Sequence, residues 1–495
     1  MRGKLLARNI VTAIIVQITT IICGFILPRL ILSNFGSEVN GLVNSISQFI
    51  AIISFLDLGV GAVFQSTLYK PLAEKNNDVI SEIYVSGQKF FVRLGEILVV
   101  YVVLLMILYP NFAGKEFGFV YTSTLIGAIS ISSFAQYFLG MANGLFIAAD
   151  QKAYIPNILQ FITIVTNTLV CYVLIKLGAS IHIVKLMTSL CYLIRPILLD
   201  IYIRKNYRIN RKIKYKDEPI SQKWNGLAQH IASVVLESTD TIVLTLFASL
   251  SDVSIYSVYY LVISGIKQLF SSITTGIQAL IGELYARQDQ KALITVFGWT
   301  EWVLHTTATF VFGCTATLII PFVLVYTNGV NDANYNRPLF SILIVLAYLM
   351  YTYRLPYHIA IKAAVHYKQT QICYAVAAIL NISVSVVTVW KFGLVGVAIG
   401  TLIAMSYQML WMAYYNSKSI IKRPLGVFWK QVVIDIITFM VGLFATKVIQ
   451  IKELSYFEWT IGAVENAILW GAIVIVINLV FYPRRIKELI KKVKK

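Results

Sequence analysis

The sequence predicts an all-α polytopic membrane protein, because long apolar segments fill the chain and basic residues gather in alternate connections between them. Of the 495 residues, 58% are hydrophobic and only 13% are charged, and the mean hydropathy is +0.74. In lipid the backbone must satisfy its own hydrogen bonds, so only helices or a closed β-barrel can cross a bilayer. The apolar segments are much longer than the ~10 residues of a barrel strand, which favours helices.

We expect about fourteen transmembrane helices. Nearly all of the apolar segments reach the roughly 20 residues that a helix needs to cross ~30 Å of hydrocarbon. In chain order they cover residues 10–32, 41–68, 90–109, 119–148, 153–175, 181–203, 226–249, 253–283, 294–326, 338–361, 371–390, 393–415, 427–446 and 460–482.

The distribution of Lys and Arg predicts the orientation of these helices. The chain has 42 such residues and a formal net charge of +19. We assign 31 of them to the two ends of the chain and to the connections after even-numbered helices, seven to the opposite connections and four to the interior of the helices. Basic residues near the end of a segment are counted with the adjoining connection. Since short cytoplasmic loops carry the excess of Lys and Arg, both termini are predicted to be cytoplasmic. The basic stretch 204–216 is interpreted as a cytoplasmic loop beside anionic lipid, and not as a nucleic-acid site.

A weak internal repeat of about 215 residues suggests how the helices are organised. The short acidic turn at 33–39 is similar to the turn at 247–253, and Asn167 matches Asn381. Because six helices separate the two copies, both enter the membrane from the same side, which predicts parallel repeats related by an axis along the membrane normal.

The repeat predicts four parts of the chain. They are an N-terminal six-helix lobe (1–203), a basic cytoplasmic linker (204–225), a C-terminal six-helix lobe (226–416), and an added helix pair with a basic cytoplasmic tail (417–495). Two such lobes usually enclose a substrate site and alternate between inward-open and outward-open states.

Pro196, Pro321 and Pro356 interrupt predicted helices and favour kinks there. The pairs Gly140–Gly144 and Gly396–Gly400 favour close helix packing.

An enzyme is not expected. The chain contains no HExxH, GxSxG or Walker A motif, and no long segment outside the apolar ones that would form a soluble catalytic domain. Its five cysteines lie in or at the ends of apolar segments, and none has the spacing of a metal site. We therefore expect no cofactor, no metal and no disulfide.

Four basic side chains inside predicted helices are the candidate substrate-binding residues: Arg29, Arg195, Lys267 and Arg354. A charge inside a membrane helix is costly unless it is paired or faces water, so such residues are functional candidates. Together they predict a cationic cavity, and arginine suits phosphate because its planar fork gives two parallel donors. Alternatively, Arg29 reaches the outer headgroups, and Arg195 is satisfied near the inner surface with Asp200. Four tyrosines around Arg354 are consistent either with sugar stacking or with an interfacial belt.

The candidates for ion coupling or for ion pairs are Asp57, Glu237, Asp240, Glu301 and His305. Glu237 and Lys267 are expected at similar depth on consecutive helices, so they are candidates for a structural ion pair. Glu301 and His305 are four residues apart and share a helix face. His305 is either a proton carrier or a histidine satisfied within the helix bundle.

Several motifs resemble one family. A basic N-terminus leads to a span ending Pro28-Arg29, residues 35–42 read FGSEVNGL, residues 55–61 read FLDLGVG, and residues 393–401 read GLVGVAIGT. Along essentially its whole length, the chain resembles the bacterial polysaccharide-biosynthesis flippases. These are the O-antigen and capsule repeat-unit translocases of the multidrug/oligosaccharidyl-lipid/polysaccharide exporter superfamily.

The resemblance implies two six-helix lobes around a cationic cavity in a bacterial cytoplasmic membrane. It implies that an undecaprenyl-pyrophosphate-linked oligosaccharide moves from the inner to the outer leaflet by alternating access, for cell-surface polysaccharide synthesis. The related lipid II flippases use arginines in helices 1, 2 and 8. Arg29 and Lys267 match the first and last of these by helix and charge, whereas helix 2 here carries Asp57 and no arginine.

The alternatives are an ion-coupled multidrug or cation exporter, a lipid II flippase, and a membrane scaffold or polymerase without transport activity. A cation exporter would favour carboxylates in the cavity, and polymerases usually carry a large outer loop that this chain lacks. The expected partners are a lipid-linked oligosaccharide, membrane lipids, a polysaccharide polymerase and glycosyltransferases. The expected coupling ion is H+ or Na+.

Overall fold

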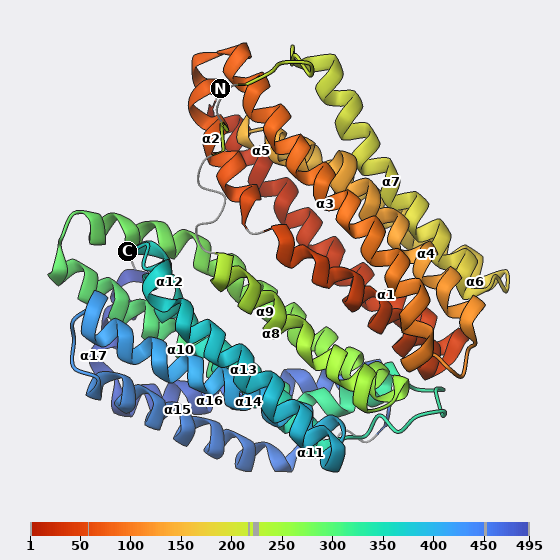
Figure 1. Ribbon diagram of the computed structural model, residues 1–495. Helices are drawn as coiled ribbons and strands as arrows, with labels where there is room; N and C mark the ends of the chain where they lie inside the picture. The colour runs from red at the N-terminus through yellow and green to blue at the C-terminus, as the bar shows by residue number, and fades with distance from the viewer. Residues whose placement is uncertain (1, 58, 216–217, 221–226, 450–452, 494–495) are drawn as a thin grey trace. The chain divides into compact units, whose positions relative to one another are not determined.

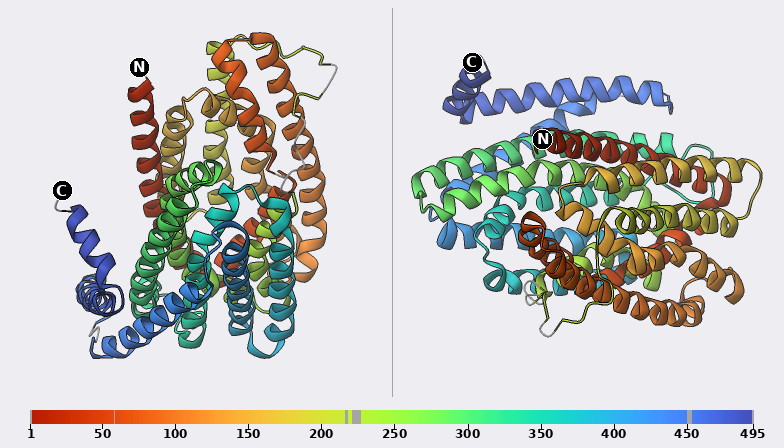
Figure 2. Two further views of the ribbon diagram at one scale, coloured as in Figure 1. Left: turned by 90° about the vertical axis from the view of Figure 1, so that its left-hand side faces the viewer. Right: turned by 90° about the horizontal axis from the view of Figure 1, so that it is seen from above.

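The computed structural model describes residues 2–57, 59–215, 218–220, 227–449 and 453–493, and in it the chain folds into long helices (Figures 1 and 2). Within this described part, twelve helical runs are long and apolar enough to cross a membrane, and no strand is present. The protein is therefore an all-α, multi-pass membrane protein, as its composition predicts.

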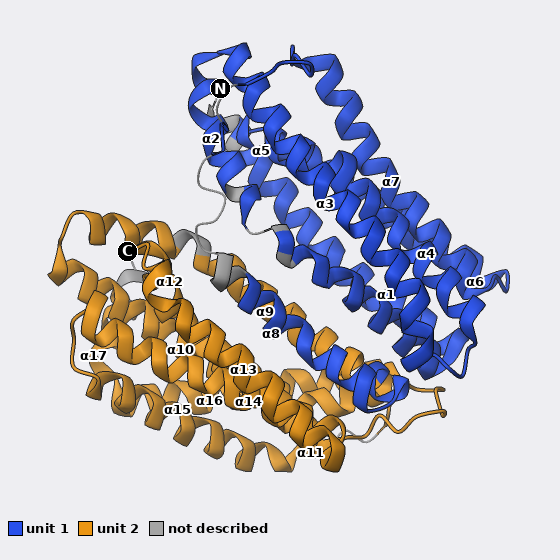
Figure 3. Cartoon of the chain, viewed as in Figure 1, with its two compact units in different colours: residues 1–254 blue, residues 255–495 orange. Residues whose placement is uncertain are grey.

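The chain divides into two compact units, residues 1–254 and 255–495 (Figure 3). The first unit contains α1 (Arg2–Ala51), α2 (Val60–Glu74), α3 (Asn77–Phe112), α4 (Phe119–Ala135), α5 (Met141–Ala149), α6 (Tyr154–Lys176), α7 (Ile181–Asn206) and α8 (Leu227–Phe247). Helix α9 (Leu250–Ala286) begins in this unit and continues into the second. The second unit also contains α10 (Gln290–Tyr326), α11 (Pro338–Tyr353), α12 (Leu355–Ala363), α13 (Tyr367–Phe392), α14 (Leu394–Tyr415), α15 (Gly426–Ala445), α16 (Tyr456–Phe481) and α17 (Pro483–Val493). The six-helix lobes 1–203 and 226–416 remain a prediction from the repeat.

Helix α1 covers the first predicted span and the beginning of the second. The two parts meet at Gly36, whose φ of 84° and ψ of 174° are not helical. A residue with a Cβ rarely adopts this positive φ, so glycine allows the break here. The second part continues through a 3-10 segment, Ile52–Asp57, into α2.

A row of polar side chains joins the second part of α1 to α8 and the start of α9. Ser45 and Thr245 share a 2.7 Å hydrogen bond, and Asn40 donates to Ser254 at 2.7 Å. Gly41 packs so closely that a Cβ there would overlap the backbone of Leu250. Small and polar residues thus allow close packing in a medium where apolar surface gives little drive for helix association.

The basic segment after α7 packs against the first unit. Asp200 on α7 accepts from Arg204 at 2.5 Å and from Arg211 at 2.8 Å. Ile220 is buried in an apolar cluster with residues of α2, α3, α5 and α7. Part of the basic stretch 204–216 is therefore held by a carboxylate of the same unit.

Helices α13 and α14 of the second unit approach each other closely at two glycines. A Cβ at Gly396 would lie 2.5 Å from the backbone of Thr388, and one at Gly400 would overlap the side chain of Ser385. The close approach predicted for Gly396 and Gly400 is confirmed. Gly140 and Gly144 allow no comparable backbone approach, because their nearest neighbours are the side chains of Gln136 and Leu199.

The added pair, α15 and α16, packs on α10. The ring of Trp470 on α16 is fully buried and fits against two glycines, Gly313 of α10 and Gly442 of α15. Close to it, Asn466 donates to Thr317 at 2.7 Å, and further along the same pair of helices the indole of Trp302 donates to Asn478 at 2.8 Å.

One of the three predicted proline interruptions coincides with a helix break. Helix α11 ends at Tyr353 and α12 begins at Leu355, just before Pro356, so Arg354 occupies the junction. Helices α7 and α10 run without a break past Pro196 and Pro321, which corrects the expectation of interruptions there.

Candidate functional site

Two cations of the second unit lie against one aromatic ring. The guanidinium carbon of Arg354 lies 4.4 Å from the centre of the Tyr351 ring, and Nζ of Lys267 on α9 lies 5.0 Å from it. Both distances are within the range of cation–π attraction. Two of the four predicted basic site residues are therefore brought together, and the tyrosine between them was predicted only as part of an aromatic cluster.

Arg354 is buried, with 7% of its surface exposed, and one of its Nη1 protons goes to the side-chain oxygen of Gln408 on α14. Its Nε has no hydrogen-bond partner, and in the described part of the chain no carboxylate forms an ion pair with it. A buried guanidinium with an open donor is costly, so this group is suited to receive an anion.

Further basic side chains follow Arg354 along α12. His358 and Lys362 come four and eight residues later, which places all three on one face of the helix. Nδ1 of His358 lies 2.5 Å from the hydroxyl of Tyr374. Helix α12 contains no acidic residue, so this row, Arg354–His358–Lys362, presents basic groups alone.

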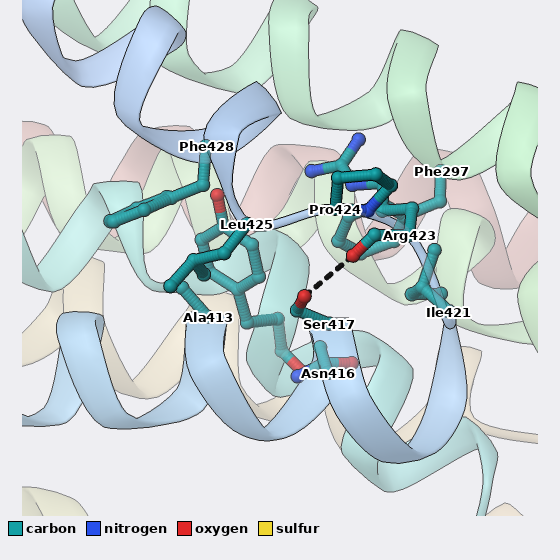
Figure 4. Close-up of a pocket in the computed structure, with 10 residues that line it drawn as sticks. Phe297, Ala413, Asn416, Ser417, Ile421, Arg423, Pro424, Leu425 and Phe428 are labelled. Carbon is teal, nitrogen blue, oxygen red and sulfur yellow. Dashed lines mark hydrogen bonds between the residues drawn. The ribbon is translucent and has the colours of Figure 1, made fainter.

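Glu301 on α10 is paired. Its Oε1 accepts from Arg423, which lies in the connection before α15, and from the hydroxyl of Tyr357 at 2.5 Å. Figure 4 shows the small pocket beside Arg423, where the Ser417 hydroxyl donates to the Arg423 carbonyl. Arg423 and Tyr357 were not among the predicted site residues.

His305, one turn after Glu301, is fully buried between three helices. Its Nδ1 lies 2.8 Å from Oδ2 of Asp435 on α15, and its Nε2 lies 3.1 Å from the carbonyl oxygen of Tyr353. The Tyr353 ring is stacked on the imidazole, with centroids 4.4 Å apart. Asp435 was missed by the sequence analysis, although a carboxylate inside the apolar segment 427–446 is the signal that identified the other candidates.

The remaining predicted residues lie in the first unit. Arg29 on α1 and Arg195 on α7 are partly buried, Asp240 on α8 is buried, and Glu237 on α8 is exposed. The side chain of Asp57 lies outside the described residues. Because Glu237 and Lys267 belong to different units, their pairing stays a prediction.

The fold is similar to that of several solved membrane transporters. A structure of the lipid II flippase MurJ in an inward closed conformation superposes with a TM-score of 0.73 at 15% identity, over 96% of this chain and 100% of that chain. No protein-family model matches the chain, and no curated protein matches it.

Two further solved structures share the fold at lower similarity. An inward-facing multidrug resistance MATE family transporter gives a TM-score of 0.60 at 14% identity and covers 84% of this chain and 99% of its own. A MOP superfamily transporter from Pyrococcus furiosus, described as having a binding pocket of reverse polarity, gives 0.62 at 10% identity, over 85% and 97%. At these identities the likeness establishes the fold only. The substrate has to be inferred from the residues of the candidate site.

Proposed function

We propose that the protein is a flippase that moves an undecaprenyl-pyrophosphate-linked oligosaccharide from the cytoplasmic to the outer leaflet of a bacterial cytoplasmic membrane. Both termini would face the cytoplasm, and the oligosaccharide would supply cell-surface polysaccharide synthesis together with glycosyltransferases and a polymerase. The two predicted six-helix lobes would alternate access to the headgroup while the lipid tail stays in the bilayer. Dragging phosphate and sugar through hydrocarbon would be prohibitively costly.

The observation that carries the proposal is the buried guanidinium of Arg354. It lacks a carboxylate in the described part of the chain, keeps an open Nε donor, and shares the Tyr351 ring with Lys267. A pyrophosphate would supply the missing negative charge and accept from the guanidinium fork. The tyrosine between the cations would offer a face to the first sugar.

The competing proposals are a multidrug or cation exporter and a lipid II flippase. A cation exporter needs carboxylates that are available to a cation. Glu301 pairs with Arg423, and Asp435 with His305, so neither is available as the bundle stands. A lipid II substrate remains chemically close, since it also carries a pyrophosphate.

The test is reconstitution of the full chain into liposomes that contain a lipid-linked oligosaccharide. A glycosidase that cannot cross the membrane would digest sugars that have reached its leaflet. We expect protein-dependent digestion well above that in empty liposomes, and a smaller effect with lipid II. Efflux of ethidium under a pH gradient, without any movement of lipid-linked sugar, would overturn the proposal in favour of the exporter.

A further inference from the structure

The hydrogen bonds around His305 fix how many protons the site holds. The carbonyl oxygen of Tyr353 can only accept, so Nε2 of His305 must carry a proton. Nδ1 faces Oδ2 of Asp435 at 2.8 Å, and a hydrogen bond there needs another proton, on either the ring or the carboxyl group. The His305–Asp435 pair therefore holds one proton more than a neutral imidazole beside an ionised carboxylate.

The contacts of Asp435 suit an ionised carboxylate with the additional proton on the imidazole. Its Oδ1 accepts from Nε2 of Gln431 at 2.9 Å, and Oε1 of Gln431 accepts from the hydroxyl of Tyr482 at 2.7 Å. Burial, together with the charge of Asp435, raises the pKa of Tyr482 to about 12, so the phenol keeps its proton and donates. This fixes the direction of the chain of bonds, which ends with Oδ1 of Asp435 as an acceptor. The stacked Tyr353 ring suits an imidazolium.

The other charged groups around the pair are engaged elsewhere. On α10, the charge of Glu301 is taken by Arg423. Arg485 on α17 donates to the carbonyl of Gly298 at 2.9 Å and lies over the rings of Trp302 and Tyr482. On α15, Lys430 lies over the Tyr482 ring, with its Nζ 5.3 Å from the ring centre. Three phenols also lie close by: Tyr353 from α11, Tyr357 from α12 and Tyr482 after α16. Within the described part of the chain, His305 is the only basic side chain within ion-pair distance of Asp435.

We propose that His305 and Asp435 form a buried proton-binding site that fastens the added helix pair to α10 and to the α11–α12 junction. With the proton bound, the pair is neutral overall, and all three partners, on α10, α15 and α11, are satisfied. Without it, a net negative charge is buried and the site loses one of its two imidazole hydrogen bonds, which is costly in this environment. Loss of the proton then loosens α15 from α10. The bound species is a proton, and the proposal does not depend on the transported substrate.

The direct test is 15N NMR of the full-length protein in lipid nanodiscs with labelled histidine. The chain has five histidines, and the spectrum of His305→Gln assigns the signal. We expect both ring nitrogens of His305 to be protonated at neutral pH. In Asp435→Asn one of them should lose its proton, because an amide group that donates to Nδ1 replaces the carboxylate that accepts from it. A neutral His305 throughout pH 5–9, or an imidazolium that persists in Asp435→Asn, would overturn the proposal.

A second test measures thermal unfolding of the purified full chain between pH 5 and 9. Folding brings the carboxylate and the imidazole together and so favours the bound proton, and this stabilisation is lost when the proton leaves at higher pH. The midpoint should fall more steeply with pH in the wild type than in Asp435→Asn. Asn478→Ala, which removes a non-titrating bond between α10 and α16, is the control and should lower the midpoint equally at each pH. Parallel curves for the wild type and Asp435→Asn would contradict the assignment.

Discussion

Arg354 donates to the side-chain oxygen of Gln408 while its guanidinium lies over Tyr351, so one buried cation is held on two sides and open on a third. The position also matters, because Arg354 occupies the junction between α11 and α12, one residue after the carbonyl that faces His305. The anion site that we propose and the proton site thus meet at the same break in the helix.

The nature of the contact at Arg354 can be tested by two substitutions. Arg354→Ala should reduce oligosaccharide translocation by at least ~10-fold, because a hydrogen bond to a charged group contributes about 1.5–3 kcal/mol. Arg354→Lys keeps the charge but loses the planar fork and should retain intermediate activity. Initial rates in the liposome assay measure both. Arg337→Ala, in the connection before α11, is the control and should leave the rate unchanged. Equal losses for Lys and Ala at position 354 would favour a purely geometric requirement for arginine.

Lys267 distinguishes substrate binding from a structural ion pair. Lys267→Ala should abolish translocation while the protein remains in the membrane, because the second cation against Tyr351 is lost. The double exchange Glu237→Lys with Lys267→Glu should stay inactive if Lys267 binds phosphate. Membrane levels by immunoblot and translocation by the glycosidase assay are the two measurements. Full recovery in the exchanged variant would show that the pair serves structure.

The glycines around Trp470 make a prediction for stability. In Gly442→Ala the added methyl group would overlap the indole ring of Trp470. Overpacking of this kind costs about 1–3 kcal/mol. Thermal unfolding should show a lower midpoint. Gly471→Ala is a matched control, because its nearest neighbour, Phe310, would be 3.8 Å away, an ordinary contact. In the background Trp470→Ala, the effect of Gly442→Ala should largely disappear, and strictly additive effects would refute the packing explanation.

A cross-link can test whether α1 moves against the start of α9. Asn40 and Ser254 share a buried 2.7 Å hydrogen bond, so cysteines at these positions should form a disulfide under mild oxidation. If transport requires the contact to open, the oxidised protein should be inactive and reductant should restore its rate. Undiminished translocation by a fully cross-linked protein would argue against rearrangement at this seam.

The predicted orientation rests on the alternation of basic loops. In a variant without the five natural cysteines, a cysteine at 252 should react with an impermeant maleimide added outside intact cells. A cysteine at 212 should react only after the cells are opened. Outside labelling at 212 would invert the topology.

Much of the architecture follows from the sequence, because span length and basic loops are properties of local composition. The added pair and the close approach at Gly396 and Gly400 belong to this group. One prediction from local composition was wrong. The prolines within α7 and α10 do not interrupt those helices, because neighbouring turns and packed helices can satisfy the freed carbonyl groups.

For the candidate site, too, the sequence predicted some features and the tertiary structure decided others. The sequence alone singled out Lys267, Glu301 and Arg354 as costly charges inside apolar segments, since that cost depends only on the residue and the lipid. It also placed His305 on the same helix face as Glu301. Only the tertiary structure decided which groups meet. Asp435 reaches His305 across 130 positions of sequence, and Gln408 reaches Arg354 across 54. Helical periodicity gives the face on which a side chain lies, but the partner on that face depends on how separate helices pack.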